Sequence, residues 1–287
     1  MGIYGELAMA RSQNFSIRKH HIGTHLVLIL AVIISIVPFL WMILTSFKTY
    51  EESIRIPLTV WPAQWNLVNY ITVWNKFPFL NFYFNTFFVM VVVIIGELII
   101  SSMAAYAFAR LNFPFKNAIF IFCLSLMMVP SQIFLIPQYD LMVKAGLNDT
   151  LIALILPRLF NVFSVFMLRQ FFLTLPRELD DAAKIDGCGF FGIYYQILLP
   201  LLKPALVSVA ILSGLSTWKD LLWPLIVNNS MEKYTLSAGL ALLIGEHTTI
   251  YPHVMAGSFL AVWPMILLYF LAQKQFVEGI AFSGIKG

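Results

Sequence analysis

Charged side chains are scarce in this chain. They make up 11% of its 287 residues, whereas 60% of the residues are apolar. A soluble domain usually carries about 25% charged residues, so this composition excludes an ordinary soluble protein and predicts an integral membrane protein. The formal net charge is only +4, and the basic residues are scattered. This pattern argues against a nucleic-acid partner.

Cysteine is also rare, and catalytic patterns are missing. Cys123 lies in an apolar run and Cys188 in a polar gap. Their spacing fits no metal site, and their separate locations argue against a structural disulfide. We find no catalytic residues in the apolar runs and no glycine-rich phosphate-binding loop ending in Lys-Ser or Lys-Thr. We therefore expect the chain itself to bind no cofactor and no metal.

Long apolar runs dominate what is present. The hydrocarbon core of a bilayer is about 30 Å thick, so about 20 apolar residues are needed for a helix that spans it. We predict six such helices, over Thr24–Leu44, Phe82–Ala109, Ala118–Val143, Leu151–Leu173, Leu202–Val227 and Val254–Phe276. The fold class expected is an all-α integral membrane protein with a transmembrane domain over 24–276, tails at 1–23 and 277–287, and an outer loop at 48–81.

The distribution of basic residues predicts the orientation. If the N-terminus is cytoplasmic, most of the 18 Lys and Arg residues fall on the cytoplasmic side of the membrane. Cytoplasmic loops carry an excess of Lys and Arg. We therefore expect both termini, and the polar gap at 176–200, to be cytoplasmic. The first apolar run has no cleavage site after it, so we expect it to remain as a membrane anchor.

The polar gap contains a distinctive arrangement of small residues. Three residues separate Ala183 from Gly187, nine separate Gly187 from Ile197, and Pro200 follows. This pattern resembles the cytoplasmic coupling loop, or EAA loop, of ABC importer membrane subunits. The resemblance implies that the segment couples the chain to an ATPase through Asp181, Ala182, Ala183, Gly187, Ile197 and Pro200.

Further motifs extend the resemblance over most of the chain. They are similar to segments of carbohydrate-type ABC permeases, and the ending is similar to the tail of the MalG-like subunit. These motifs are Pro62–Trp65 with Asn69–Tyr70, Ala104–Ala109, Leu168–Phe172 with Leu175–Glu178, Trp218–Pro224, Phe276–Gly279, Ser283–Gly284 and Lys286–Gly287.

This resemblance implies a type I ABC importer permease with cytoplasmic coupling helices, located in a bacterial or archaeal cytoplasmic membrane. The partners implied are a second, related permease subunit, two ATPase subunits that hold ATP and Mg, and an extracytoplasmic solute-binding protein. The imported solute would be a sugar or oligosaccharide. Two residues depart from the family pattern: Asp181 replaces the usual Glu, and Lys219 replaces an uncharged residue. Lys219 leaves neutral and acidic sugars open.

The residues of the 176–200 segment support a lever-like element on their own. Pro176 suits the start of a helix because its missing N–H would be unpaired there. Ala182 and Ala183 are small enough to let a partner surface approach the backbone. Gly187 and Gly189 allow a sharp turn. We therefore expect two short helices that meet at an angle, with a solvated amphipathic connector as the alternative.

Several ionisable and aromatic residues fall inside the apolar runs. Charged groups in a membrane helix normally face protein or water. We expect a polar patch on the substrate route, or mutual pairing that stabilises the helix bundle, among Glu97, Arg158, Trp218, Lys219, Asp220 and Trp223. The indole rings would suit the C–H faces of a saccharide, and the basic groups would suit an acidic one.

Other function classes remain open at this point. A proton- or ion-coupled carrier or channel could use Glu97 as a relay and would work without an ATPase. An ABC permease for a non-sugar solute is a second alternative. A membrane-embedded enzyme would need a nucleophile or metal cluster that the sequence does not show.

Overall fold

The computed structural model describes residues 3–245 and 248–284, with side chains described for 23–245, 248–270 and residue 273. The described residues form helices and no strand. The chain divides into two units, Met1–Val73 with Glu246–Phe259 and Trp74–Gly245 with Leu260–Gly287. Each unit is described by itself below.

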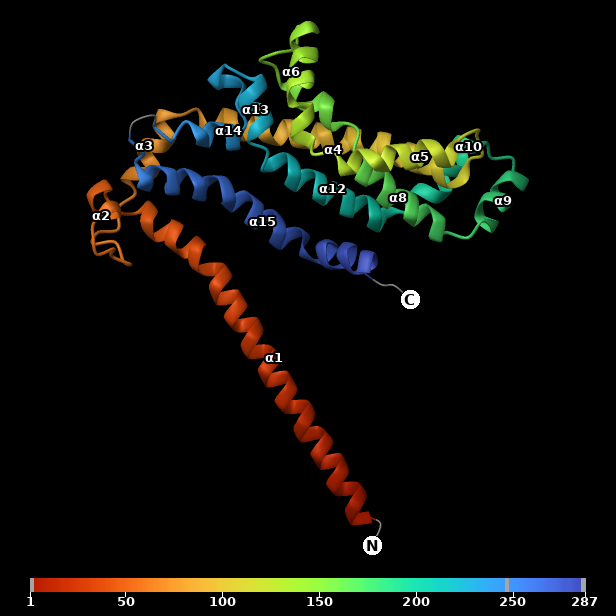
Figure 1. The fold of residues 1–287 in the computed structure, drawn as a ribbon, viewed down its shortest axis with the longest axis horizontal. Coiled ribbons are helices and arrows are strands. Elements are labelled where there is room, and N and C mark those ends of the chain that lie inside the picture. The colour runs from red at the N-terminus through yellow and green to blue at the C-terminus, as the bar shows by residue number, and fades with distance from the viewer. Residues whose placement is uncertain (1–2, 246–247, 285–287) are drawn as a thin grey trace. The chain divides into compact units, whose positions relative to one another are not determined.

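The elements follow the chain in this order (Figure 1): α1 Ile3–Ser46, α2 Tyr50–Ile54, α3 Val68–Lys76, α4 Phe79–Arg110, α5 Lys116–Ser125, η1 Leu126–Met128, η2 Ser131–Phe134, α6 Leu135–Lys144, α7 Leu151–Ile155, η3 Leu156–Arg158, α8 Val162–Thr174, α9 Glu178–Ile185, α10 Phe190–Gly192, η4 Ile193–Leu198, α11 Leu199–Leu201, α12 Lys203–Trp218, α13 Leu222–Val227, η5 Met231–Lys233, α14 Leu236–Ala241 and α15 Tyr251–Gly284.

In the first unit, the segment after α1 is bound to the end of that helix by hydrogen bonds and a cation–π contact. The side chain of Lys48 is 2% exposed, donates to the carbonyl of Thr59, and lies 4.6 Å from the ring centroid of Trp41. The amide of Asn69 donates to the carbonyls of Ser46 and Lys48 at 2.8 and 2.9 Å. The predicted outer loop is therefore folded, because buried polar groups of this kind need partners.

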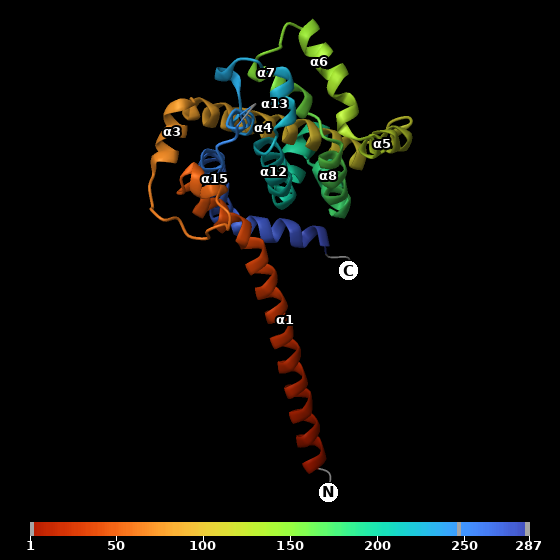
Figure 2. The ribbon, with the colours of Figure 1, turned by 60° about the vertical axis from the view of Figure 1, so that its left-hand side comes forward.

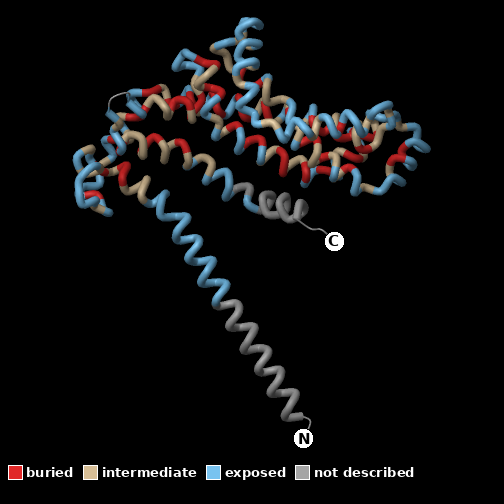
Figure 3. The backbone as a smooth tube through the Cα atoms, in the orientation of Figure 1, coloured by how far each residue is buried: buried red, intermediate tan, exposed pale blue. Residues whose placement is uncertain are grey.

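In the second unit, α4 packs against both α8 and α12, and the three helices run side by side in both views (Figure 2). Buried residues recur along all three helices (Figure 3). Close to the turn that follows α8, one apolar cluster includes four fully buried residues, Ala105, Leu168, Phe172 and Leu198. These helices therefore provide the rigid frame of the second unit.

Among the described residues, three helices are long and apolar enough to cross a membrane, namely Gly23–Ser46, Phe79–Arg110 and Tyr251–Phe270. Three bent pairs raise the number to six if each pair counts as one span. The bends are 96° between Lys116–Met128 and Ser131–Lys144, 44° between Leu151–Arg158 and Val162–Thr174, and 79° between Phe190–Leu201 and Lys203–Trp218. The described chain is thus an all-helical membrane protein, as the apolar runs predict.

The fifth apolar run differs from its predicted form. A single helix over Leu202–Val227 is wrong, because α12 ends at Trp218 and α13 begins at Leu222. Lys219 and Asp220 occupy the break between them. Charged side chains in an apolar run need protein or water around them, and Asp220 pairs with Arg158.

Candidate functional site

The 176–200 segment forms the expected pair of short helices. The first, α9, carries Glu178, Asp180 and Asp181 in its first turn, where carboxylates stabilise the positive end of the helix dipole. It begins at Glu178 rather than at Pro176, with Arg177 at the N-cap position. The expected helix start at Pro176 is therefore wrong by two residues.

One glycine makes the turn between the helices. Gly187 has φ +84, in the left-handed region that side chains disfavour. Gly189 has φ −75 and precedes α10, so its backbone needs no glycine. The turn is closed by the backbone bond from Gly187 N to the Lys184 carbonyl at 3.0 Å and that from Cys188 N to the Ala183 carbonyl at 2.9 Å.

The second helix is continuous from Phe190 to Leu201, but its middle, η4, is a π-helix. It ends at Leu201, one residue after Pro200, and α12 begins at Lys203. The π-helix was not predicted. Such segments are rare and often accompany functional sites.

The two alanines of the motif face opposite ways. Ala182 and Asp181 are exposed, whereas Ala183 is 2% exposed and is part of the chain's own core. The expectation that a partner approaches both alanines is therefore wrong for Ala183. Ile193 and Leu198 are buried with it, and Ile197 is half-buried against the same cluster.

The segment is attached to the end of α4 by polar contacts that sequence reasoning missed. Arg110 lies 3.4 Å from the carboxylate of Asp180 and donates to the Leu175 carbonyl at 2.7 Å. The hydroxyl of Tyr106 donates to the carbonyl of Phe190 at 3.0 Å. Arg110 and Tyr106 are four residues apart, a spacing that places them on one side of a helix. This spacing is the signal that could have revealed them.

The other side of the segment exposes apolar groups. Ile185 is 86% exposed, Phe190 and Phe191 are each 66% exposed, and Tyr195 is 61% exposed. The rings of Phe191 and Tyr195 are stacked, with their centroids 6.3 Å apart. We call these four residues the exposed ridge. An exposed apolar surface beside polar residues is typical of a contact with another protein or with a membrane.

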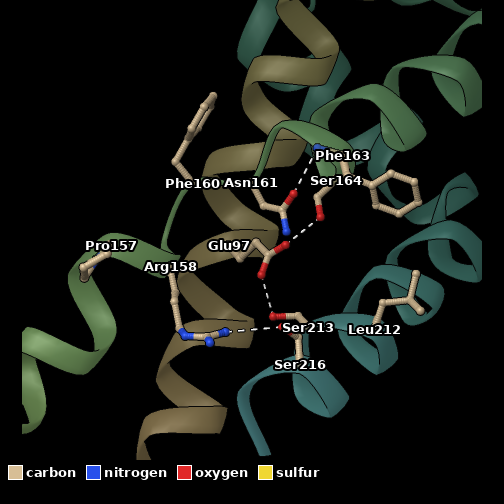
Figure 4. A pocket seen from close by; sticks show the side chains of 10 residues that line it. All are labelled: Glu97, Pro157, Arg158, Phe160, Asn161, Phe163, Ser164, Leu212, Ser213 and Ser216. Carbon is tan, nitrogen blue, oxygen red and sulfur yellow. Dashed lines mark hydrogen bonds between the residues drawn. The ribbon is translucent and has the colours of Figure 1, made fainter. Parts of the chain in front are cut away.

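A second candidate site surrounds Glu97 on α4. Glu97 is 3% exposed, and the hydroxyls of Ser164 on α8 and Ser213 on α12 each donate to one of its oxygens (Figure 4). A cavity of about 210 Å³ adjoins it. The cavity is lined by Glu97, Pro157, Arg158, Phe160, Asn161, Phe163, Ser164, Leu212, Ser213 and Ser216.

Arg158 forms an ion pair beside this cavity. Its Nη2 lies 2.6 Å from Oδ2 of Asp220, and its Nη1 donates to Ser216 at 3.4 Å. The expected mutual pairing within the apolar runs is present for these two charges. A second cavity of about 290 Å³ is lined by Ser131, Gln132, Phe134, Leu135, Gln138, Pro157, Arg158, Asp220, Leu222 and Trp223.

Of the remaining predicted substrate residues, Trp223 lines the second cavity, whereas Trp218 and Lys219 line neither cavity. Trp223 is buried and its indole donates to the Ala153 carbonyl at 2.9 Å, although it lines the second cavity. The indole of Trp218 donates to the Ala261 carbonyl at 3.2 Å. Lys219 is exposed and lines neither cavity. Sequence reasoning missed the polar residues Ser164, Ser213, Asn161, Gln132 and Gln138, whose position within apolar runs was the available signal.

Comparison with known proteins agrees with this architecture. Residues 97–281 match the family of binding-protein-dependent transport system inner membrane components. The arabinooligosaccharides transport system permease protein AraQ of Halalkalibacterium halodurans is 37% identical over 257 residues, which cover 88% of this chain and 92% of that protein. The sn-glycerol-3-phosphate transport system permease protein UgpE of Brucella suis is 32% identical, covering 89% and 94%.

A solved structure shows the same fold. It is a chain of a bacterial ABC transporter involved in the import of the acidic polysaccharide alginate, with a TM-score of 0.79 and 22% identity. The match covers 90% of this chain and 97% of that one. With the family match over 97–281 and the long alignments to curated permeases, the chain belongs to the binding-protein-dependent transport system inner membrane components, the permease subunits of ABC importers.

Proposed function

We propose that this chain is one permease half of an ATP-driven importer of a saccharide. An extracytoplasmic solute-binding protein would deliver the solute, and a second, related permease would complete the pathway. Two partner ATPases would bind ATP and Mg and perform the hydrolysis. The long similarity to an arabinooligosaccharide permease supports a sugar, and the family supports this set of partners.

The proposed docking site for an ATPase is the exposed ridge. The observation that carries the proposal is the two-sidedness of the 176–200 segment. Its inner side is bound to α4 through Arg110 and Tyr106, while its outer side exposes Ile185 and Phe191. A partner that moves the ridge would therefore move α4. The segment and both termini would be cytoplasmic, which the distribution of Lys and Arg supports.

A charge placed on the ridge tests the docking. We expect Ile185→Asp to reduce the ATPase recovered with a tagged chain from native membranes at least tenfold, because a carboxylate would be buried against the partner. The control is Ile56→Asp, in the outer segment, where the isoleucine is 91% exposed. It should leave ATPase recovery within twofold of the original. Equal recovery with both variants would contradict docking at the ridge.

The same purification separates the importer from the carrier alternative. A carrier that uses Glu97 as a proton relay would be recovered without an ATPase, and uncouplers would stop its uptake. The importer would be recovered with an ATPase, and its uptake would stop when ATP is depleted while the proton gradient is kept.

A further inference from the structure

The two cavities of the second unit share a wall. Pro157 and Arg158 line both of them. The guanidinium of Arg158 contacts Ser216, which lines the first cavity, and Asp220, which lines the second. The Arg158–Asp220 ion pair therefore lies between the two cavities.

The uncharged polar groups around these spaces suit hydroxyl groups. The second cavity offers the side-chain amides of Gln132 and Gln138. The first offers the amide nitrogen of Asn161, whose Oδ1 already accepts from Phe163 N, and the hydroxyl of Ser216, which accepts from Arg158. An amide both donates and accepts hydrogen bonds, as a hydroxyl does. Within the part of the chain that the structure describes, the amides of Gln132 and Gln138 form no hydrogen bond with protein groups. Their hydrogen-bonding capacity is thus available to a solute.

The charges around the same spaces disfavour an anion. Among the described lining residues, Arg158 is the cation, and Asp220 and Glu97 are the carboxylates. The lining therefore carries two acidic groups against one basic group. The cation is already paired at 2.6 Å. An incoming carboxylate or phosphate would compete with Asp220 for Arg158 and would meet the field of Glu97 in a medium of low dielectric constant.

We propose that the two cavities form one passage that accepts neutral, hydroxyl-rich saccharides and excludes anionic ones, with the Arg158–Asp220 pair as its divider. A sugar hydroxyl can accept a hydrogen bond from Arg158 and donate one to Asp220 at the same time. Such charge-assisted bonds leave the balance of charge unchanged. The inference rests on the proposed function as a permease and specifies its substrate class.

Charged thiol reagents can measure the selectivity without knowledge of the natural solute. We would replace Cys123 and Cys188 with serine and introduce Ser216→Cys or, separately, Gln138→Cys into the complete importer in its membrane. Each thiol would be reacted with a cationic trimethylammonium methanethiosulfonate and with its anionic sulfonate counterpart. Modification would be followed by mass spectrometry of this chain, and rates would be divided by those of free cysteine.

We expect the cationic reagent to react at least fivefold faster at both positions. Asp220→Asn, which frees Arg158, should raise the rate of the anionic reagent at least fivefold, and Glu97→Gln should reduce the preference. Ile56→Cys, outside the cavities, gives the reference for each reagent. Equal rates, faster reaction of the anion, or no reaction at either cavity position would overturn the proposal. ATPase recovery with Ile185→Asp is independent of these rates, so the failure of one proposal does not imply failure of the other.

Discussion

Asp149 joins two loops of the second unit with a single carboxylate. Its Oδ1 accepts hydrogen bonds from the backbone of Asn229 and Ser230, both at 2.9 Å, and its Oδ2 accepts one from the Ser230 hydroxyl. Burial acts to raise the pKa of Asp149, but the hydrogen bonds from Ser230 and Asn229 and the charge of Lys233 outweigh it. The pKa of Asp149 therefore lies below its ordinary value.

This connection should weaken in acid. A carboxyl group with a lowered pKa in the folded state contributes stability above its unfolded pKa of about 3.9, and the contribution is lost as the pH falls through the folded value. We expect amide exchange in 228–231, corrected for its intrinsic rate, to be slow at pH 7 and to accelerate on acidification. Asp149→Asn should show fast exchange already at pH 7.

The control for this measurement is Asp140→Asn. Asp140 pairs with Lys144, but both side chains are more than half exposed, so the pair contributes little. Exchange in 228–231 should be unchanged in this variant. A pH-independent exchange rate in the original chain would contradict the role of Asp149.

Some residues of the candidate sites could be predicted from the sequence, but the residues that they contact could not. Hydropathy placed Glu97, Arg158 and Asp220 inside apolar runs, where charged groups must find partners. It could not show that Arg158 pairs with Asp220 while Glu97 accepts from two serines, because these contacts join distant helices. The inward direction of Ala183 depends in the same way on which helix covers α9.

At the scale of elements, the turn at Gly187 sets the angle between α9 and α10. Its φ of +84 is strongly unfavourable for a β-branched residue. Gly189, two residues later, has an ordinary φ of −75, and a Cβ atom added there would have nothing within 4 Å. The two glycines therefore differ in backbone conformation while belonging to the same turn.

A matched pair of substitutions isolates this conformation. We expect Gly187→Val to reduce ATP-dependent uptake at least tenfold, with the protein still present in the membrane, because the turn must change its shape. Gly189→Val should keep uptake within about threefold. Uptake in membrane vesicles, normalised to the amount of chain, provides the measurement. Similar losses from both variants would show that the left-handed turn is not what matters.

The prediction of elements succeeded where a long apolar run is one helix or one bent pair, and it failed where a helix ends inside such a run. The runs at 82–109 and 151–173 correspond to α4 and to the bent pair that ends in α8. The 96° bend lies at Pro130, a residue type that bends or breaks a helix. The break at Lys219 carries no such signal and interrupts an apolar run that hydropathy reads as one helix. The π-helix η4 contains no proline or glycine that would mark it.

At the scale of the molecule, α4 connects the two candidate sites. Glu97 lies in its middle and Arg110 at its end, separated by about 20 Å of helix. The side chains of Arg110 and Asp180 are 4% and 12% exposed. Removing one partner of a buried ion pair typically costs about 3–5 kcal/mol, so this contact can hold the 176–200 segment to α4.

Cutting this connection should separate hydrolysis from transport. In proteoliposomes that contain the complete importer, we expect Arg110→Ala to lower the amount of saccharide imported per ATP hydrolysed at least fivefold. Lys184→Ala is the control, because its ion pair with Asp181 is exposed and weak. If the ratio stays constant in Arg110→Ala while the membrane level is normal, motion reaches α4 by another route.

The polar contacts of α4 also restrict how that helix can move. Near one end, Asn85 donates to the carbonyls of Glu232 and Tyr234, and near the other Ser102 bonds to the hydroxyl of Tyr194. Rotation of α4 about its own axis would break these contacts near both ends of the helix. A tilt of α4 together with the segments bound to it would keep them. We therefore expect this permease subunit to move by a rocking motion in which α4 tilts as a rigid body.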